Sequence, residues 1–199
     1  MSDRPVFNQI YQLARPYLNT RHNNVHTEIS IQLAYQLLRA EGGQEDIVIP
    51  AIILHDIGWQ KVPASLHLKA FGPKATSPEI NRTHEKEGVK IARKILTKIN
   101  YDTEKIDEIL KIIDGHDSRK DSISLNDRIV KDADKLWRYT QNGFEIDKGR
   151  FEETVAEGLN RLRKNLRGWF YTDTAFQIAK KELQQRETEA GNDSRPAGN

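Results

Sequence analysis

The chain contains no cysteine, a single methionine and no long run of apolar residues. Without cysteine it has no disulfide bond, no thiolate site for zinc or an iron–sulfur cluster and no thiol nucleophile, so any metal must be held by nitrogen and oxygen atoms. No apolar segment approaches the roughly 20 residues of a membrane-spanning helix. The N-terminus, Met-Ser-Asp-Arg-Pro, lacks a basic segment followed by an apolar one. We therefore expect no signal peptide, no membrane partner and a cytoplasmic location.

Charge of one sign is not in excess either. The 199 residues include 31 basic and 29 acidic side chains, which give a formal net charge of +2 and an isoelectric point of about 8.7. This balance is too mild to indicate a nucleic-acid polymer as a partner. The length suits one domain with a sizeable core, and it leaves a homodimer possible as the assembly.

The apolar residues recur at helical spacing, and no segment shows the alternation of a strand. The pattern predicts helices over residues 5–18, 26–41, 45–57, 102–116, 125–139, 149–167 and 173–187, and another that starts at about Ser77 or at Thr83 and ends at Asn100. It also predicts a long loop over 58–78, which we interpret as a lid beside the substrate, and a turn at Asn142-Gly143. The predicted fold is an all-α, compact single-domain helical bundle over 1–188, followed by a flexible tail at 189–199.

The apolar run from Ile52 ends in two adjacent side chains that can bind metal, His55 and Asp56, and then in Gly58. The apolar run would bury both polar groups, and a buried carboxylate is costly unless it is paired or bound to a metal. A helix end with a polar cap is the alternative interpretation of this pair.

Four of the six histidines lie at the inward edge or the end of a predicted helix: His26, His55, His84 and His116. Helical bundles build metal sites from side chains on facing helices. With Asp56 and the aspartates Asp132 and Asp134, these histidines predict a metal site in the bundle core. The alternative is four separate buried histidines, each with its own hydrogen-bond partner. Helical projection does not decide between the two later aspartates.

These motifs resemble the HD-domain superfamily of metal-dependent phosphohydrolases over residues 22–138. The matching pieces are His26, then Leu54-His55-Asp56-Ile57-Gly58, then Ala133-Asp134-Lys135-Leu136. The resemblance implies an all-α fold and a metal site carried by His26, His55, Asp56 and Asp134. It favours Asp134 over Asp132, which is then a supporting residue, an alternate ligand or a solvated charge.

Two more histidines resemble the branch of that superfamily with a dinuclear centre. His84 begins the run His-Glu-Lys-Glu-Gly-Val, and His116 lies near the end of Ile-Ile-Asp-Gly-His-Asp. The resemblance implies a second cation held by Asp56, His84 and His116, with Asp56 bridging the two ions. We therefore expect two divalent transition metal ions. Analogy favours iron or manganese, and ligand type leaves cobalt, zinc or nickel open.

The resemblance implies hydrolysis of a nucleotide or another small phosphate ester, because a cation lowers the pKa of bound water and polarises the phosphoryl group. We predict catalytic roles for Asp56, Glu85 and Asp117. We predict that the substrate phosphate is bound by Lys61, Arg82, Arg119 and Lys135, each of which has a solvated surface charge as its alternative.

Two other functions fit parts of the pattern. A mixed-valent diiron oxygenase acting on an organophosphonate would use the same histidines and aspartates. A non-catalytic regulatory module that binds metal or nucleotide would be indicated by a missing ligand, and the sequence shows none. His67 is either a general acid or a plain loop histidine, and Trp59 either stacks on a base or packs in the core.

Overall fold

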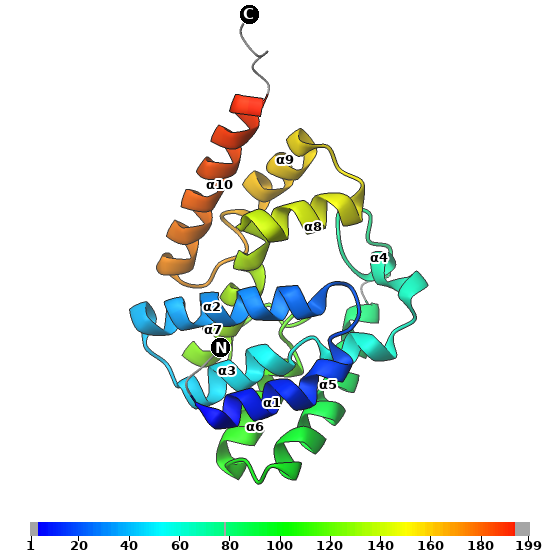
Figure 1. Cartoon of the computed structure of the whole chain (residues 1–199), viewed down its shortest axis with the longest axis vertical. Coiled ribbons are helices and arrows are strands. Elements are labelled where there is room, and N and C mark those ends of the chain that lie inside the picture. Colours follow the sequence, from blue (N-terminus) through cyan, green and yellow to red (C-terminus); the bar gives the residue numbers. More distant parts are fainter. Residues whose placement is uncertain (1–3, 78, 194–199) are drawn as a thin grey trace, which may run out of the picture.

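The computed structural model describes residues 4–77 and 79–193, and they form helices joined by short connections (Figure 1). The α-helices are α1 (Pro5–Ala14), α2 (Asn23–Glu41), α3 (Glu45–Leu54), α4 (His67–Ala70), α5 (Glu79–Lys98), α6 (Thr103–Ile113), α7 (Leu125–Leu136), α8 (Gln141–Phe151), α9 (Val155–Asn165) and α10 (Asp173–Asp193). Short 3₁₀ segments are η1 (Arg15–Tyr17), η2 (Ile57–Lys61), η3 (Ala64–Leu66) and η4 (Trp137–Tyr139). No strand occurs in these described ranges, so the predicted all-α fold is confirmed.

Helix α3 lies at the centre, because all of its residues from Ile47 to Leu54 are buried. It packs against α1, α2, α6 and α7. Pro50 lies inside α3 and has no N–H, which removes the usual partner of the Asp46 carbonyl one turn earlier. The Tyr101 hydroxyl donates to that carbonyl oxygen at 2.7 Å. The proline is therefore tolerated in the central helix because a side chain replaces the missing donor.

Helix α5 crosses very close to η2, and a glycine makes this possible. A Cβ atom on Gly58 would lie 1.9 Å from the carbonyl oxygen of His84 and 2.5 Å from the amide nitrogen of Gly88. No side chain fits in that space, so residue 58 has to be glycine for the two segments to touch. The close crossing brings His84 to the end of α3, where His55 and Asp56 lie.

Helices α8, α9 and α10 occupy one end of the molecule, and α5 and α6 occupy the other (Figure 1). Most buried apolar residues, from Phe7 in α1 to Leu183 in α10, belong to one continuous cluster, and Trp59, Val62 and Ala70 form a second, smaller one. In the part of the chain that the structure describes, no helix is both long enough and apolar enough to cross a bilayer.

The prediction of one helix over 149–167 is wrong, as is the turn at Asn142-Gly143. Asn142 and Gly143 lie in the first turn of α8, where the Thr140 hydroxyl accepts a hydrogen bond from the Gly143 N–H at 3.2 Å. The chain then breaks at Glu152, whose φ of 55° is left-handed. Helix α9 starts with a capping box between Thr154 and Glu157. This Thr-x-x-Glu pattern was the signal in the sequence for a new helix start.

Two other boundaries differ. The segment 58–78 contains η2, η3 and α4 instead of only a loop. Helix α10 continues to Asp193, so the predicted tail at 189–199 is helical up to that residue, and the rest of it lies outside the described residues.

Candidate metal centre

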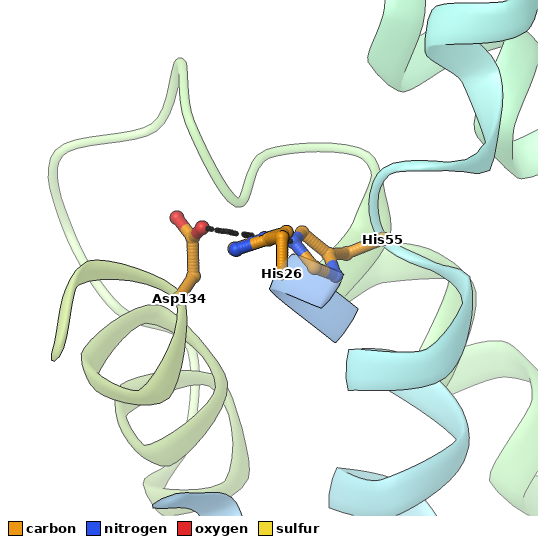
Figure 2. Close-up of side chains that lie close together, drawn as sticks. All are labelled: His26, His55 and Asp134. Carbon is orange, nitrogen blue, oxygen red and sulfur yellow. Dashed lines mark hydrogen bonds and ion pairs between the residues drawn. The ribbon is translucent and has the colours of Figure 1, made fainter. Parts of the chain in front are cut away.

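Figure 2 shows His26 from α2, His55 from the end of α3 and Asp134 from α7 with their polar atoms turned toward one another. The Nε2 atoms of His26 and His55 lie 2.9 Å apart. An Oδ1 atom of Asp134 lies 3.3 Å from the first and 3.6 Å from the second. All three side chains are buried. Three elements that are distant in the sequence thus supply one compact group of donor atoms.

A second group lies beside the first. His84 comes from α5, and His116 and Asp117 follow the end of α6. The two histidine Nε2 atoms lie 3.2 Å apart, and the Asp117 Oδ2 atom lies 3.7 Å from His84 and 3.8 Å from His116. Asp117, which we predicted as a catalytic residue, is therefore placed as a candidate ligand.

The Asp56 carboxylate lies between the two groups. Its Oδ2 atom is 3.6 Å from the Nε2 atom of His26. Its Oδ1 atom is 3.8 Å from His55, 3.8 Å from His84 and 3.6 Å from His116. One carboxylate thus reaches all four imidazoles, which is the position a bridging ligand requires.

The pair His-Asp occurs twice, as His55-Asp56 after α3 and as His116-Asp117 after α6. In both pairs the histidine Nδ1 atom contacts the carbonyl oxygen three residues earlier, at 2.8 Å for Ile52 and 2.9 Å for Ile113. Since a carbonyl only accepts, Nδ1 carries a proton in both rings, and Nε2 is the atom that can present a lone pair to a metal ion. Metal-binding histidines are oriented in this way.

The spacing of the donor atoms fits a transition metal ion. Two ligand atoms that are each about 2.1 Å from an ion lie about 3 Å apart when the angle between them is near 90°. The two Nε2 pairs, at 2.9 Å and 3.2 Å, match this spacing. Two buried Nε2 atoms this close share either a proton or a metal ion, and with the carboxylate oxygens beside them these nitrogens fit the metal ions that we predicted.

The electrostatics of the group favour bound cations. Burial raises the pKa of Asp56, but His55, His116 and His26 outweigh this and hold it well below its usual range. Burial and the neighbouring His116 lower the pKa of His84 to about 3. Burial opposes charge on His116, yet the carboxylates of Asp56 and Asp117 raise its pKa to about 9. The acids are thus ionised at neutral pH, and their field would favour a metal ion as it favours a proton.

The structure separates the two later aspartates. Asp134 lies in the first group, whereas both oxygens of the Asp132 carboxylate face the start of α10. They accept hydrogen bonds from the backbone N–H groups of Tyr171 and Thr172 and from the Thr172 hydroxyl, at 2.7–2.9 Å. Burial raises the pKa of Asp132 to about 6. Its role here is to fix the connection to α10.

Glu85, predicted as catalytic, is directed away from the two groups. Its buried carboxylate accepts hydrogen bonds from the N–H groups of Asp117 and Ser118, from the Ser118 hydroxyl and from Arg82, at 2.6–3.0 Å. All of its oxygen atoms are used in holding the segment that carries Asp117. The geometry therefore gives Glu85 a positioning role.

A cavity of about 490 Å³ opens onto the metal candidates. Of the four residues predicted to bind the substrate phosphate, only Lys135 lines it, and its Nζ donates to Asp117 at 2.7 Å and to Asp134 at 2.5 Å. Lys61 is exposed outside the lining. The other two are committed elsewhere, because Arg82 binds Glu85 and Asp114, and Arg119 binds Asp127.

The cavity is lined by cations that the sequence did not indicate: Arg21, Arg138, Arg161 and Lys164. Arg21 precedes α2 in a segment that reads as a polar break, and the others lie on ordinary polar helix faces, so no motif marks them. Part of the predicted lid also lines the cavity, through Trp59, Phe71, Gly72 and Pro73. His67 contacts the Val62 carbonyl oxygen at 3.0 Å, as a plain packed histidine does.

Trp59 connects the lid segment to the candidate ligands. Its ring stacks on His84 with the centroids 4.1 Å apart and 15° between the planes, and its indole N–H donates to Asp56 at 3.0 Å. The guanidinium of Arg21 lies 3.8 Å from the Trp59 ring and 4.1 Å from the Phe71 ring. Trp59 thus packs in the core and also holds the Asp56 carboxylate beside an arginine.

Comparison with known proteins identifies one family. The model of the HD domain matches residues 25–139, which is more than half of the 199-residue chain. No curated protein and no solved structure matches the chain. HD domains bind divalent metal ions and are typically metal-dependent hydrolase domains, and the matched range contains every candidate ligand described above. The chain belongs to the HD-domain family.

Proposed function

We propose that this protein is a phosphohydrolase that cleaves a nucleotide or another small phosphate ester at a dinuclear metal centre. The observation that supports this most is the position of Asp56 between two His/Asp groups that open into one cavity. The first ion would be held by His26, His55, Asp134 and Asp56, and the second by His84, His116, Asp117 and Asp56. Iron and manganese are the metals we favour.

Bound divalent ions would supply a nucleophile from water at neutral pH and would neutralise charge on the phosphoryl oxygens. The protein side chains bind and orient the substrate. Among the described residues, the Nε and Nη1 atoms of Arg21 are buried without a hydrogen-bond partner. Its guanidinium packs on Trp59, which in turn donates to Asp56. Arg21 is therefore fixed next to the metal candidates with free donors, as a clamp on the reacting phosphoryl group requires.

The test is metal analysis of the purified protein, followed by assays of p-nitrophenyl phosphate and nucleoside monophosphates with manganese or iron added. We expect about two metal ions per chain and measurable phosphate release. Asp56→Asn should lose both, because its carboxylate faces both groups. A protein that stays metal-free when offered these ions, or that binds two ions and releases no phosphate from any ester, would contradict the proposal.

The oxygenase remains the second candidate, since the same donor set serves both reactions. Oxygen uptake by the iron-loaded protein in the presence of an organophosphonate, without hydrolysis of esters, would identify it. A non-catalytic regulatory module is less consistent with a complete set of donors. A small-molecule substrate, a cytoplasmic location and a possible homodimer also stay predictions.

A further inference from the structure

The cavity at the metal candidates has a wall that comes from outside the matched HD domain. Residues 25–139 contribute Asp56, Asp117, Asp134 and Lys135. The wall from α8, α9 and the segment that follows contains Phe151, Arg161, Lys164, Asn165 and Trp169. Part of the cavity wall is thus built by a segment that carries none of the candidate ligands.

The charges on this lining are unbalanced. Its cations are Arg21, Lys135, Arg138, Arg161 and Lys164. Its only acids are Asp56, Asp117 and Asp134, and all three are candidate metal ligands. Bound metal ions would therefore take up the negative charge of the lining. The remaining wall is cationic and complements an anionic substrate.

The arginines of the wall are held rigidly. Arg138 donates to Asp147 at 2.8 Å, and Arg150, behind the wall, donates to the other oxygen of Asp147 at 2.8 Å. Arg161 donates to both oxygens of Glu153 at 3.0 Å and lies 3.7 Å from Asp147. Three guanidinium groups thus share two carboxylates, which leaves an excess of positive charge in a largely buried cluster. Such an excess is costly without a compensating anion.

Two of the lining cations have no acidic partner among the described residues, Arg21 and Lys164. Arg21 belongs to the metal side of the cavity, because the ring on which it packs donates to Asp56. Lys164 belongs to α9, three residues after Arg161, and neighbouring positions at this spacing share one helix face. The cavity therefore offers free positive charge at two places.

We propose that the substrate is an organic phosphate with a second phosphoryl group, and that the unpaired Lys164 binds this second group, with Arg161 adding positive charge beside it while it stays bound to Glu153. The inference rests on the proposed function, in which the first phosphoryl group lies at the metal centre beside Arg21. Two adjacent cations match a phosphoryl dianion better than a single-charged carboxylate. The second group is attached either directly to the first, as in a diphosphate, or to the far end of the leaving group, as in a bisphosphate.

The test compares three adenosine compounds that differ only in this group: AMP, ADP and adenosine 3′,5′-bisphosphate. With manganese-loaded protein, we expect kcat/KM for ADP or for the bisphosphate to exceed that for AMP about tenfold or more, as a charge-assisted contact predicts. The compound with the higher kcat/KM identifies where the second phosphoryl group is attached. Lys164→Gln should reduce the gain to about one- to threefold.

The matched control is Arg167→Gln, which removes the same charge from an exposed position outside the cavity lining. It should keep the full preference for two phosphoryl groups. Equal kcat/KM for all three compounds, or an unchanged preference in Lys164→Gln, would overturn the inference and leave the proposed function intact.

A binding measurement separates this inference from the proposed function. In metal-depleted protein, calorimetry should show adenosine 3′,5′-bisphosphate or ADP binding about tenfold more tightly than AMP, and Lys164→Gln should abolish the difference. This result would support the second phosphoryl site even if the loaded protein hydrolysed none of the three compounds. Equal binding of the three compounds would count against the site.

Discussion

The four candidate histidines differ in the partner of their Nδ1 atom, the ring nitrogen that does not face the other candidate ligands. Those of His55 and His116 contact backbone carbonyls, and that of His26 lies 3.5 Å from the Ser30 hydroxyl. The Nδ1 atom of His84 is buried and has no hydrogen-bond partner in the described residues. His84 is instead oriented by its stack on Trp59. The second group is therefore the one that should lose its ion first.

His84→Ala should lower the metal content from two ions to about one, because the second ion would then keep only one histidine, His116, beside Asp117 and the shared Asp56, while the His26 group stays complete. Elemental analysis of the purified variant measures this. His22→Asn is the control, since His22 lies outside both groups and its left-handed φ of 59° suits asparagine. Two ions retained in His84→Ala would exclude His84 as a ligand of the second ion.

The two aspartates of α7 should respond differently to substitution. Asp134→Asn should lose the first metal ion, because its carboxylate lies between His26 and His55. Asp132→Asn should keep both ions but lower the free energy of unfolding by about 1–3 kcal/mol, since three donors from residues 171 and 172 converge on its carboxylate. Metal analysis and chemical denaturation measure the two effects. The reverse pattern would assign the ligand to Asp132.

At the scale of elements, the close crossing of η2 and α5 should be the least tolerant contact. Gly58→Ala places a Cβ atom against backbone atoms of His84 and Gly88, which cannot move aside as a side chain can. We expect a loss of about 3 kcal/mol or more in the free energy of unfolding. Gly149→Ala in α8 is the control, because a Cβ there has nothing within 4 Å and should stabilise by about 0.4–1 kcal/mol. Equal stability of the two variants would contradict the close backbone contact between η2 and α5 at Gly58.

The N-terminus of α3 depends on charge. Burial raises the pKa of Asp46, but hydrogen bonds from Lys105, at 2.9 Å, and from Arg4 outweigh it and hold the pKa below its usual value. A lowered pKa in the folded state contributes stability above the unfolded pKa of about 3.9, and this contribution is lost as the pH falls through the folded value.

Asp46→Asn should therefore lower the Tm by about 1–3 °C at pH 7, and the difference from the unmodified protein should shrink below about pH 3.9. Thermal unfolding between pH 3 and pH 7 measures it. A difference that stays constant over this range would mean that the ion pairs contribute nothing.

Apolar periodicity and helix caps explain which helices could be predicted well from the sequence. The periodic helices α2, α5, α6 and α7 were expected close to their observed bounds, because an apolar stripe marks each of them and a cap marks three of them, at Gly42, Asp102 and Ser124. The region around α8 and α9 was not, since Gly143 and Gly149 lie inside helix α8, and glycine in a sequence indicates a turn. Tertiary packing overrides that local preference.

At the scale of the molecule, the sequence predicted the candidate ligands better than the cavity. Four of the seven candidate ligands form two His-Asp pairs just after helix ends, His55-Asp56 and His116-Asp117, and such a pattern can be read along the chain. The cavity wall joins Arg21 to α9, and its residues share no motif or spacing. Asp117 was expected to be catalytic and not a ligand, because it follows a candidate ligand and could accept a proton. Its distance of 3.7 Å from His84 depends on how α5 and α6 pack. The sequence alone does not give that packing.

Removal of metal should lower the stability of the whole fold, because the candidate ligands come from α2, α5, α7 and the ends of α3 and α6. A ligand at about 100 times its Kd stabilises by about 2.7 kcal/mol, so the Tm of manganese-loaded protein should fall by about 5–10 °C on addition of EDTA. Magnesium should restore little of it, since imidazole suits transition metals. Asp56→Asn is the control, and its Tm should not change when EDTA is added. An unchanged Tm in the unmodified protein would contradict the presence of a metal centre.

The far wall of the cavity lies on α9, beyond the matched range of 25–139, whereas every candidate ligand lies inside that range. Mutations that accumulate in α9 over generations thus meet no constraint from the metal chemistry. Duplicated copies of such a chain can diverge in substrate specificity while their metal ligands stay identical. The exchange of one short helix is enough to begin that divergence.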